Sequence, residues 1–209
     1  MGFAKLEISG GVMVALRHAA YLQDAGYQVM LLSFYDTCTE FTFMNHSFPV
    51  LPFKNEKLDA KIDCGVATMW PTVKMLDDVR CIENKKYLVQ NYEIDFYDFK
   101  DPRKVEASVT YSYPFDYVTI SKWCKEWLKS EFNQETAWIY NGIDIEQYRP
   151  HKREFKDKIR ILIEGDSSSA HKNVDEAFLV SNKLDSSKYE VWYMSYNAKP
   201  KDWYRVDKF

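Results

Sequence analysis

The chain has 209 residues, of which 46% are hydrophobic, 16% aromatic and 28% charged. This composition predicts a soluble globular protein with a packed core and excludes a disordered chain. The formal net charge of −3 creates no basic field that would gather phosphate backbones, so we expect no nucleic acid partner.

The opening residues, MGFAKLEISGG, lack the basic region and apolar run of a secretory signal. No apolar stretch approaches the ~20 residues that span a bilayer. We therefore expect a cytoplasmic protein, with a peripheral contact at the inner face of the membrane left open. The four cysteines form no C-x-x-C pair, which predicts neither a zinc site nor a disulfide framework but reduced, mostly buried thiols.

Short strand-like runs alternate with helix-like segments, which predicts an α/β fold with a mainly parallel sheet. Apolar residues recur at helical spacing after Gly10 and Gly11, and Gly26 suits the cap of that helix. Residues 27–34 then suit a buried strand. A doubly wound domain normally opens with a strand that feeds the glycine loop, so the domain is expected to lack its first strand.

The pattern continues with alternating elements after a stretch, FPVLPF, that is expected to be irregular. It predicts strands over 63–68, 86–90, 116–120 and 136–140, and helices over 70–79, 101–110 and 121–132. Pro71 is compatible with a first helical turn, and Ser121 is an N-cap candidate. Asn141 and Gly142 form a strong turn signal that closes this half of the chain.

A polar segment over 143–158, which contains Pro150, breaks the alternation and is expected to be a linker. It divides a first domain, 1–142, from a second, 159–209. The second opens with a strand, a loop of small residues, a helix over 173–184 and another strand. One βαβ unit cannot bury both faces of its sheet, so we expect 159–209 to be the truncated start of a domain.

Two glycine-containing loops are candidates for phosphate binding. The loop from Gly165 to Lys172 joins a strand to a helix, and such loops direct backbone N–H groups toward one point. Lys172 would add a positive charge there. The alternative is an ordinary turn with a surface lysine. Gly10 and Gly11 allow the same two interpretations, because glycine permits both close approach and a simple turn.

Polar residues follow the strand over 86–90, at the end where α/β domains place their ligands. This cluster contains Asn91 and Glu93. Glu93 suits a base or an acceptor of sugar hydroxyls, and the alternative is an exposed loop carboxylate. No Ser/His/Asp or Cys/His arrangement can be assembled from the chain with any specificity.

In this order, several segments resemble the family 4 glycosyltransferases. IYNGIDIEQYRP, residues 139–150, resembles the family's interdomain segment. ISGGVMVALRHAAYLQDAGYQVMLL, residues 8–32, resembles its opening glycine loop, first helix and second strand. HKNVDEAF, residues 171–178, resembles its donor-domain Lys-Gly-Val-Asp segment. YLVQNYEIDFY, residues 87–97, is similar to bacterial rhamnosyltransferases that build surface polysaccharides.

The resemblance implies a GT-B arrangement, in which two Rossmann-like domains face each other across a cleft. It implies transfer of rhamnose or another hexose from a dTDP-, UDP- or GDP-linked donor to a glycan or lipid-linked glycan. The reaction would need no metal and no cofactor and would retain the anomeric configuration. The implied site residues are Lys172 as the catalytic group at the leaving diphosphate, Gly10, Gly11, Gly165 and Asp166 on the donor, Asn91 and Glu93 on the acceptor side, and Asn141 and Gly142 between the domains.

The chain departs from the family pattern in three places. Asp166 replaces an arginine that the family uses on phosphate, and Asn173 replaces a glycine. The family's E-x-(F/Y)-G-x-x-x-x-E segment lies beyond Phe209, so we expect a fragment without activity of its own. A non-catalytic binding or interaction module derived from such an enzyme is the alternative. A nicotinamide-dependent oxidoreductase is disfavoured, because the dinucleotide fingerprint is missing.

Overall fold

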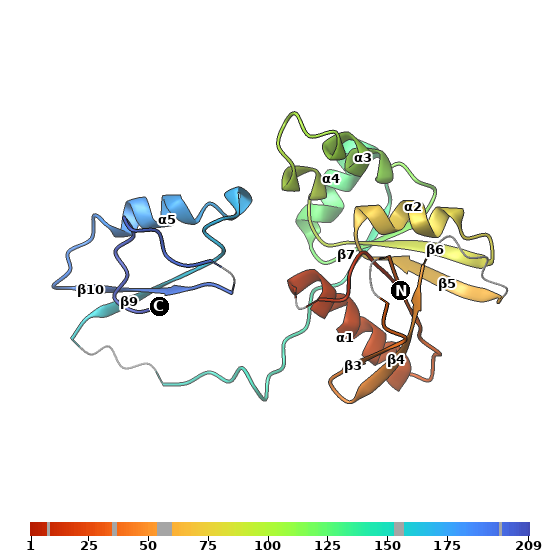
Figure 1. The fold of residues 1–209 in the computed structure, drawn as a ribbon, viewed down its shortest axis with the longest axis horizontal. Coiled ribbons are helices and arrows are strands. Elements are labelled where there is room, and N and C mark those ends of the chain that lie inside the picture. Colours follow the sequence, from red (N-terminus) through yellow and green to blue (C-terminus); the bar gives the residue numbers. More distant parts are fainter. Residues whose placement is uncertain (8, 35–36, 54–59, 153–156, 197) are drawn as a thin grey trace. The chain divides into compact units, whose positions relative to one another are not determined.

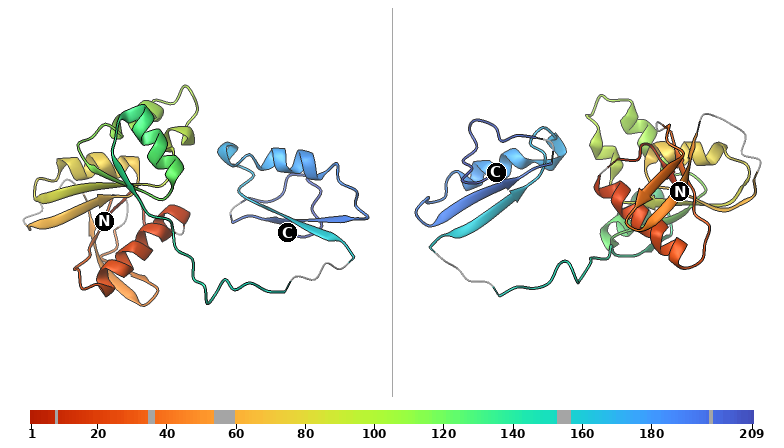
Figure 2. Two further views of the ribbon diagram at one scale, coloured as in Figure 1. Left: turned by 180° about the vertical axis from the view of Figure 1, so that it is seen from behind. Right: turned by 60° about the horizontal axis from the view of Figure 1, so that its bottom comes forward.

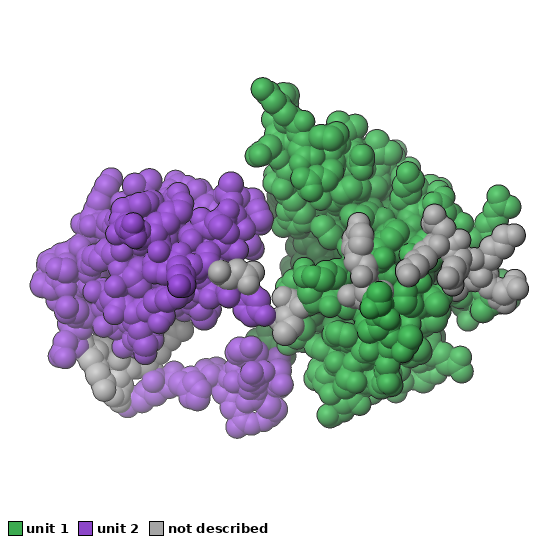
Figure 3. Space-filling view, in the orientation of Figure 1, with its two compact units in different colours: residues 1–143 green, residues 144–209 purple. Residues whose placement is uncertain are grey.

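The computed structural model describes residues 1–7, 9–34, 37–53, 60–152, 157–196 and 198–209 (Figure 1). The chain divides into two compact units, Met1–Ile143 and Asp144–Phe209, which Figure 3 colours separately. This division falls at the start of the expected linker, 143–158. The described part of that segment contains neither helix nor strand.

The described part of the first unit is built on one sheet with the strand order β3-β4-β2-β1-β5-β6-β7-β8. Every neighbouring pair is parallel except β3 and β4. The strands are β1 (Gly2–Phe3), β2 (Leu31–Ser33), β3 (Glu40–Phe43), β4 (His46–Pro52), β5 (Ile62–Ala67), β6 (Ile82–Val89), β7 (Asp116–Thr119) and β8 (Thr136–Trp138). The predicted α/β class with a mainly parallel sheet is confirmed, and the arrangement is consistent with a Rossmann-like fold.

Helices cover both faces of this sheet, as the views in Figure 1 and Figure 2 show. The helices are α1 (Gly10–Asp24), α2 (Trp70–Asp78), α3 (Arg103–Thr110) and α4 (Lys122–Phe132). Strand β6 shows why two layers form, since its side chains alternate between faces. Leu88 packs in the core under α1, whereas Tyr87 and Val89 pack in the core under α2, α3 and α4.

The expectation that the first strand is missing is wrong. Gly2 and Phe3 form β1 in the middle of the sheet, where Gly2 pairs with Leu32 of β2 and Ala67 of β5. Phe3 is 0% exposed. So short a run gives little periodic signal, but two neighbouring strands satisfy its backbone groups.

The stretch FPVLPF, expected to be irregular, instead belongs to β4. This strand is parallel to β2 and antiparallel to β3. The hairpin between β3 and β4 turns at Met44, whose φ is +56°. Pro49 and Pro52 explain why the sequence did not predict this strand. Proline has no N–H to donate to the hydrogen bonds between strands, so it normally argues against a strand. The strand expected over 27–34 is also shorter than predicted, since β2 covers only Leu31–Ser33.

Local signals placed the remaining helices of this unit well, but they did not predict β3, and β6 begins at Ile82, before the strand expected over 86–90. The Ser121 hydroxyl accepts a hydrogen bond from the Cys124 N–H at 3.1 Å, as an N-cap should. Gly26, after α1, has a φ of +90°, which suits a glycine. The expectation of mostly buried thiols is wrong, because Cys38 and Cys64 are exposed and only Cys124 is buried.

The second unit contains β9 (Ile159–Glu164), the short helix η2 (Ala170–Lys172), α5 (Val174–Ser181) and β10 (Tyr189–Met194). The two strands are parallel, and its buried core includes Phe178, Val191 and Tyr204. The expected helix over 173–184 is shorter, and its capping box does not form. Asn173 has a φ of +49°, and its side chain bonds the Glu176 carboxylate instead of a backbone group.

Within the described ranges, none of the helices combines the length and the apolar character that crossing a bilayer requires.

Candidate functional site

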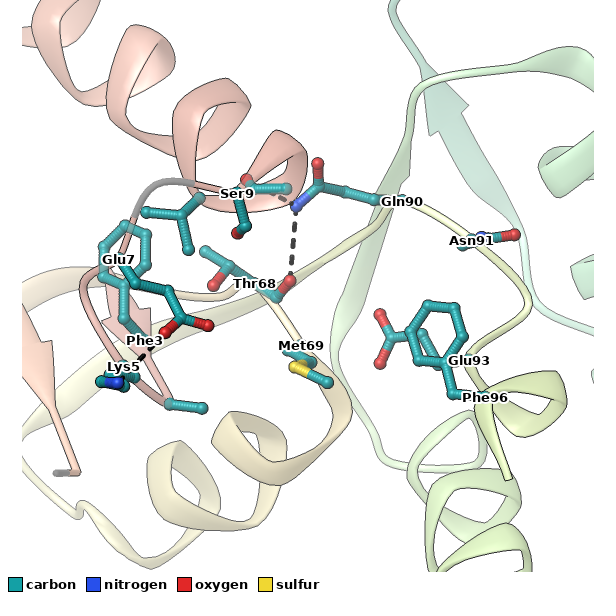
Figure 4. Close-up of a pocket in the computed structure, with 13 residues that line it drawn as sticks. Phe3, Lys5, Glu7, Ser9, Thr68, Met69, Gln90, Asn91, Glu93 and Phe96 are labelled. Carbon is teal, nitrogen blue, oxygen red and sulfur yellow. Dashed lines mark hydrogen bonds and ion pairs between the residues drawn. The ribbon is translucent and has the colours of Figure 1, made fainter. Parts of the chain in front are cut away.

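The first unit contains a pocket of about 330 Å³ at the edge of the sheet where β1, β5 and β6 end. Parallel strands bring their carboxyl ends to one edge, which is where open α/β sheets bind ligands. The residues that line it are Phe3, Ala4, Lys5, Glu7, Ser9, Gly11, Val12, Thr68, Met69, Gln90, Asn91, Glu93 and Phe96 (Figure 4). Segments far apart in the sequence therefore meet at one cavity.

Glu93 is the buried carboxyl group of this pocket. It opens the short helix η1 (Glu93–Phe96) and is only 2% exposed. Its Oε2 accepts hydrogen bonds from the Trp70 N–H at 2.6 Å and from the Tyr87 hydroxyl at 3.0 Å. Its own N–H donates to the Tyr111 hydroxyl at 3.0 Å. The interpretation of Glu93 as an exposed loop carboxylate is therefore wrong.

Burial changes the protonation of Glu93. Desolvation raises its pKa from the usual 4.5 to about 7, although the bonds from Trp70 and Tyr87 act in the opposite direction. Burial also raises the pKa values of Tyr87 and Tyr111 above the usual 10, so both phenols remain neutral near pH 7. A carboxyl group that is partly ionised at neutral pH can accept or supply a proton there.

The other carboxyl oxygen of Glu93, Oε1, is open to the pocket. Oε2 makes both side-chain hydrogen bonds of the residue, and Oε1 has no partner among the described residues. Figure 4 shows the carboxyl group pointing toward the interior of the group of lining residues. The fold thus fixes one oxygen and leaves the second available to a ligand.

Gln90 connects the end of β6 to the start of α1. Its Nε2 donates to the Gly11 carbonyl at 3.1 Å and lies 3.4 Å from the Thr68 carbonyl oxygen. A Cβ added to Gly11 would lie 3.4 Å from this nitrogen, so glycine permits the close approach. Gly10 begins α1 but does not line the pocket, and a Cβ there would meet no atom within 4 Å.

Asn91 lines the pocket beside Glu93. Its Oδ1 accepts a hydrogen bond from the Tyr92 N–H at 2.8 Å. Lys5 and Glu7 also line the pocket and form an ion pair of 3.1 Å. Sequence reasoning anticipated Asn91 and Glu93 together but missed this pair, because no periodic or turn signal marks residues 4–7.

The second unit brings Gly165, Asp166 and Lys172 onto one loop between β9 and α5. Gly165 has a φ of +142°, and a Cβ on it would lie 2.8 Å from Val174 Cγ2 and 3.8 Å from Lys172 Cβ. Asp166 accepts hydrogen bonds from the N–H and hydroxyl of Ser168, which lower its pKa. This carboxylate therefore stabilises the loop internally.

Lys172 lies at the end of η2 and is exposed, and its ammonium group forms no ion pair with any described residue. Its backbone N–H donates to the Ser169 carbonyl at 3.0 Å. These observations suit both a phosphate-binding lysine and a surface lysine. Lys172 and Gly165 therefore share a loop, while the pocket with Glu93 belongs to the first unit.

Asn141 and Gly142 lie against α1, at the end of the first unit. With Val14, Arg17, His18 and Tyr21 they line a shallow hollow of about 30 Å³. Burial lowers the pKa of His18. The turn predicted at these two residues does not form, since the chain turns only at 145–147, and a Cβ on Gly142 would meet no atom within 4 Å.

No protein-family model and no curated protein sequence matches this chain. Among the described residues, no group of three or more His, Cys, Asp and Glu side chains is arranged to hold a metal ion. The site must therefore be interpreted from its own geometry.

Proposed function

We propose that this chain is part of a family 4 glycosyltransferase of the GT-B type. It would carry the acceptor-side domain (1–142), a linker (143–158) and the start of the donor-side domain (159–209). The observation that supports this proposal most directly is the pocket at the carboxyl edge of the parallel sheet, which is lined by buried Glu93 and by Gly11 of the first turn of α1.

The proposed reaction moves rhamnose or another hexose from a dTDP-, UDP- or GDP-linked donor to a glycan or lipid-linked glycan. The bond from the anomeric carbon to the diphosphate oxygen breaks, the acceptor hydroxyl oxygen bonds to that carbon, and the hydroxyl proton passes to the departing diphosphate. The charge that develops on the leaving diphosphate is the demanding part of this step, and a fixed cation stabilises it. Lys172 would supply that cation, and the family resemblance implies retention of configuration.

In this proposal the pocket in the first unit receives the acceptor. Glu93 Oε1 and the Asn91 amide offer hydrogen-bonding groups to sugar hydroxyls, while Val12, Met69 and Phe96 provide apolar surface. Sugars have polar edges and apolar ring faces, so such a mixed lining suits them.

A transfer assay with the full-length enzyme, using dTDP-, UDP- and GDP-sugars, tests the proposal. The substitution Lys172→Ala should lower the rate about 100-fold or more, the usual effect of removing one charge-stabilising donor. Lys183→Ala removes another exposed lysine beyond α5 and should leave the rate unchanged. Equal rates for wild type and Lys172→Ala would reject the role of Lys172.

The 209-residue chain itself should show no transfer and at best weak nucleotide binding by calorimetry. Acceptor binding without any transfer by the full-length protein would favour the alternative, a non-catalytic binding module. Robust turnover by the chain would overturn the view that it is an inactive fragment.

A further inference from the structure

The lining of the pocket in the first unit is mixed. Val12, Met69 and Phe96 contribute apolar side chains, and Phe96 lies beside Glu93 in Figure 4. Gln90 and Asn91 contribute amides, which are neutral hydrogen-bonding groups. A ligand that fills the space beside Glu93 therefore needs an apolar face and a polar edge.

Glu93 specifies what the polar edge must contain. Hydrogen bonds from the Trp70 N–H and the Tyr87 hydroxyl hold Oε2, and they fix the orientation of the carboxyl group. Oε1 is left without a partner in the described part of the chain, although the residue is 2% exposed. Oε1 is open to the pocket, and a ligand hydroxyl that enters the pocket can donate a hydrogen bond to it.

The charges around the pocket oppose an anionic ligand in this space. Two carboxyl groups line the pocket, Glu93 and Glu7. Its one lysine among the described lining residues, Lys5, already forms an ion pair of 3.1 Å with Glu7. The start of α1 adds only the partial positive charge of a helix end, equivalent to about half an elementary charge. A carboxylate or phosphate beside Glu93 would therefore meet net repulsion.

We infer that the space beside Glu93 binds an uncharged sugar ring whose hydroxyl donates a hydrogen bond to Glu93 Oε1, and that it rejects sugars carrying a carboxylate. The assignment of this ring as the acceptor of transfer rests on the proposed function. The binding preference itself follows from the lining, the open oxygen and the charges of the pocket.

Matched pairs of methyl glycosides test this inference on the 209-residue chain. Each pair consists of a neutral methyl hexoside and the corresponding methyl uronate, and the parent sugars are glucose, galactose and mannose. Methyl rhamnoside and methyl fucoside are tested as further neutral ligands. Affinities come from protein-observed NMR titrations at pH 8. We expect at least one neutral glycoside to bind, and its uronate partner to bind at least about tenfold more weakly.

The substitution Glu93→Gln should weaken binding of the neutral glycoside about tenfold or more, since it replaces a charged hydrogen-bond acceptor with a neutral one. It should also reduce the difference in affinity between the neutral glycoside and the uronate of each pair. Asp95→Asn, two residues along the same short helix but exposed and outside the lining, is the matched control and should change neither affinity.

Three results would overturn the inference: a uronate that binds as tightly as its neutral partner, equal affinities for wild type and Glu93→Gln, or no binding by any glycoside. The comparison of pairs uses wild-type protein alone, so it holds even where a variant fails to fold. Neutral binding together with no transfer by the full-length enzyme would reject the proposed reaction and leave this inference standing. Transfer of sugar to uronate-terminated acceptors by the full-length enzyme would support the proposed reaction and reject this inference.

Discussion

The titration of Glu93 should make the first unit less stable as the pH rises from 5 to 8. Its pKa is raised to about 7 in the folded protein, from a usual value of 4.5. Below pH 4.5 the folded and unfolded states both hold the proton. Between 4.5 and 7 only the unfolded state loses it, so the free energy of unfolding falls across this range and becomes constant above pH 7.

The size of the effect follows from the two pKa values. Each unit of pKa difference is worth about 1.4 kcal/mol, so the full change is about 3 kcal/mol. Most of this change, about 2–3 kcal/mol, should appear between pH 5 and pH 8, because the carboxyl group of the unfolded state already begins to ionise below pH 5. Tyr87 and Tyr111 add nothing in this range, since their pKa values are raised above 10.

Hydrogen exchange at the amides of β6 measures this change in the first unit alone. Relative to Glu93→Gln, the wild type should lose about 2–3 kcal/mol of protection between pH 5 and pH 8. Asp95→Asn should follow the wild type, because Asp95 is exposed. The carbon-13 shift of the Glu93 carboxyl should titrate near pH 7. A midpoint near 4.5, or the same pH profile for wild type and Glu93→Gln, would refute the reasoning.

Four further substitutions test local structure in the two units. Gly165→Ala should destabilise the second unit by about 1–3 kcal/mol in urea titrations, because its Cβ would lie 2.8 Å from Val174. Gly26→Ala is the control, because Gly26 also has a positive φ but a Cβ there would meet no atom within 4 Å. It should lower the free energy of unfolding of the first unit by less, and equal losses for the two variants would contradict a clash at Gly165. Ser121→Ala should cost the first unit about 1 kcal/mol by removing the N-cap of α4, and no loss would argue against the cap. Gln90→Ala should speed hydrogen exchange in the first turn of α1, and unchanged rates there would show that Gln90 does not hold that turn.

The elements that the sequence predicted well are those with strong local signals. Helix α4 has an amphipathic pattern and a serine at its start, and the Ser121 side chain caps it as expected. Strand β6 ends in an apolar run, residues 87–89, which is followed by the polar residues Gln90 and Asn91. Because parallel strands end at one edge, the same reasoning placed Asn91 and Glu93 at a common site.

The features that the sequence did not predict depend on contacts between distant residues. The burial of Glu93 comes from Trp70, Tyr87 and Tyr111, which are 23, 6 and 18 residues away along the chain. No spacing rule connects these side chains. Strand β1 is similar, because two residues become a strand only through the neighbours that pair with them.

The buried carboxyl group itself argues for a ligand in the pocket. The two hydrogen bonds to Oε2 require only an acceptor, and the amide oxygen of a glutamine would accept them equally well. A glutamine would also avoid the cost of about 3 kcal/mol that ionisation of Glu93 imposes above pH 7. Packing and hydrogen bonding therefore do not explain the acid. What a glutamate adds is an ionisable oxygen, Oε1, that faces the cavity and can accept a strong hydrogen bond from a hydroxyl. If Glu93→Gln stabilises the first unit at pH 8 and weakens glycoside binding, stability has been exchanged for recognition at this residue. If it stabilises the unit and leaves binding unchanged, the carboxyl group has no part in binding these glycosides.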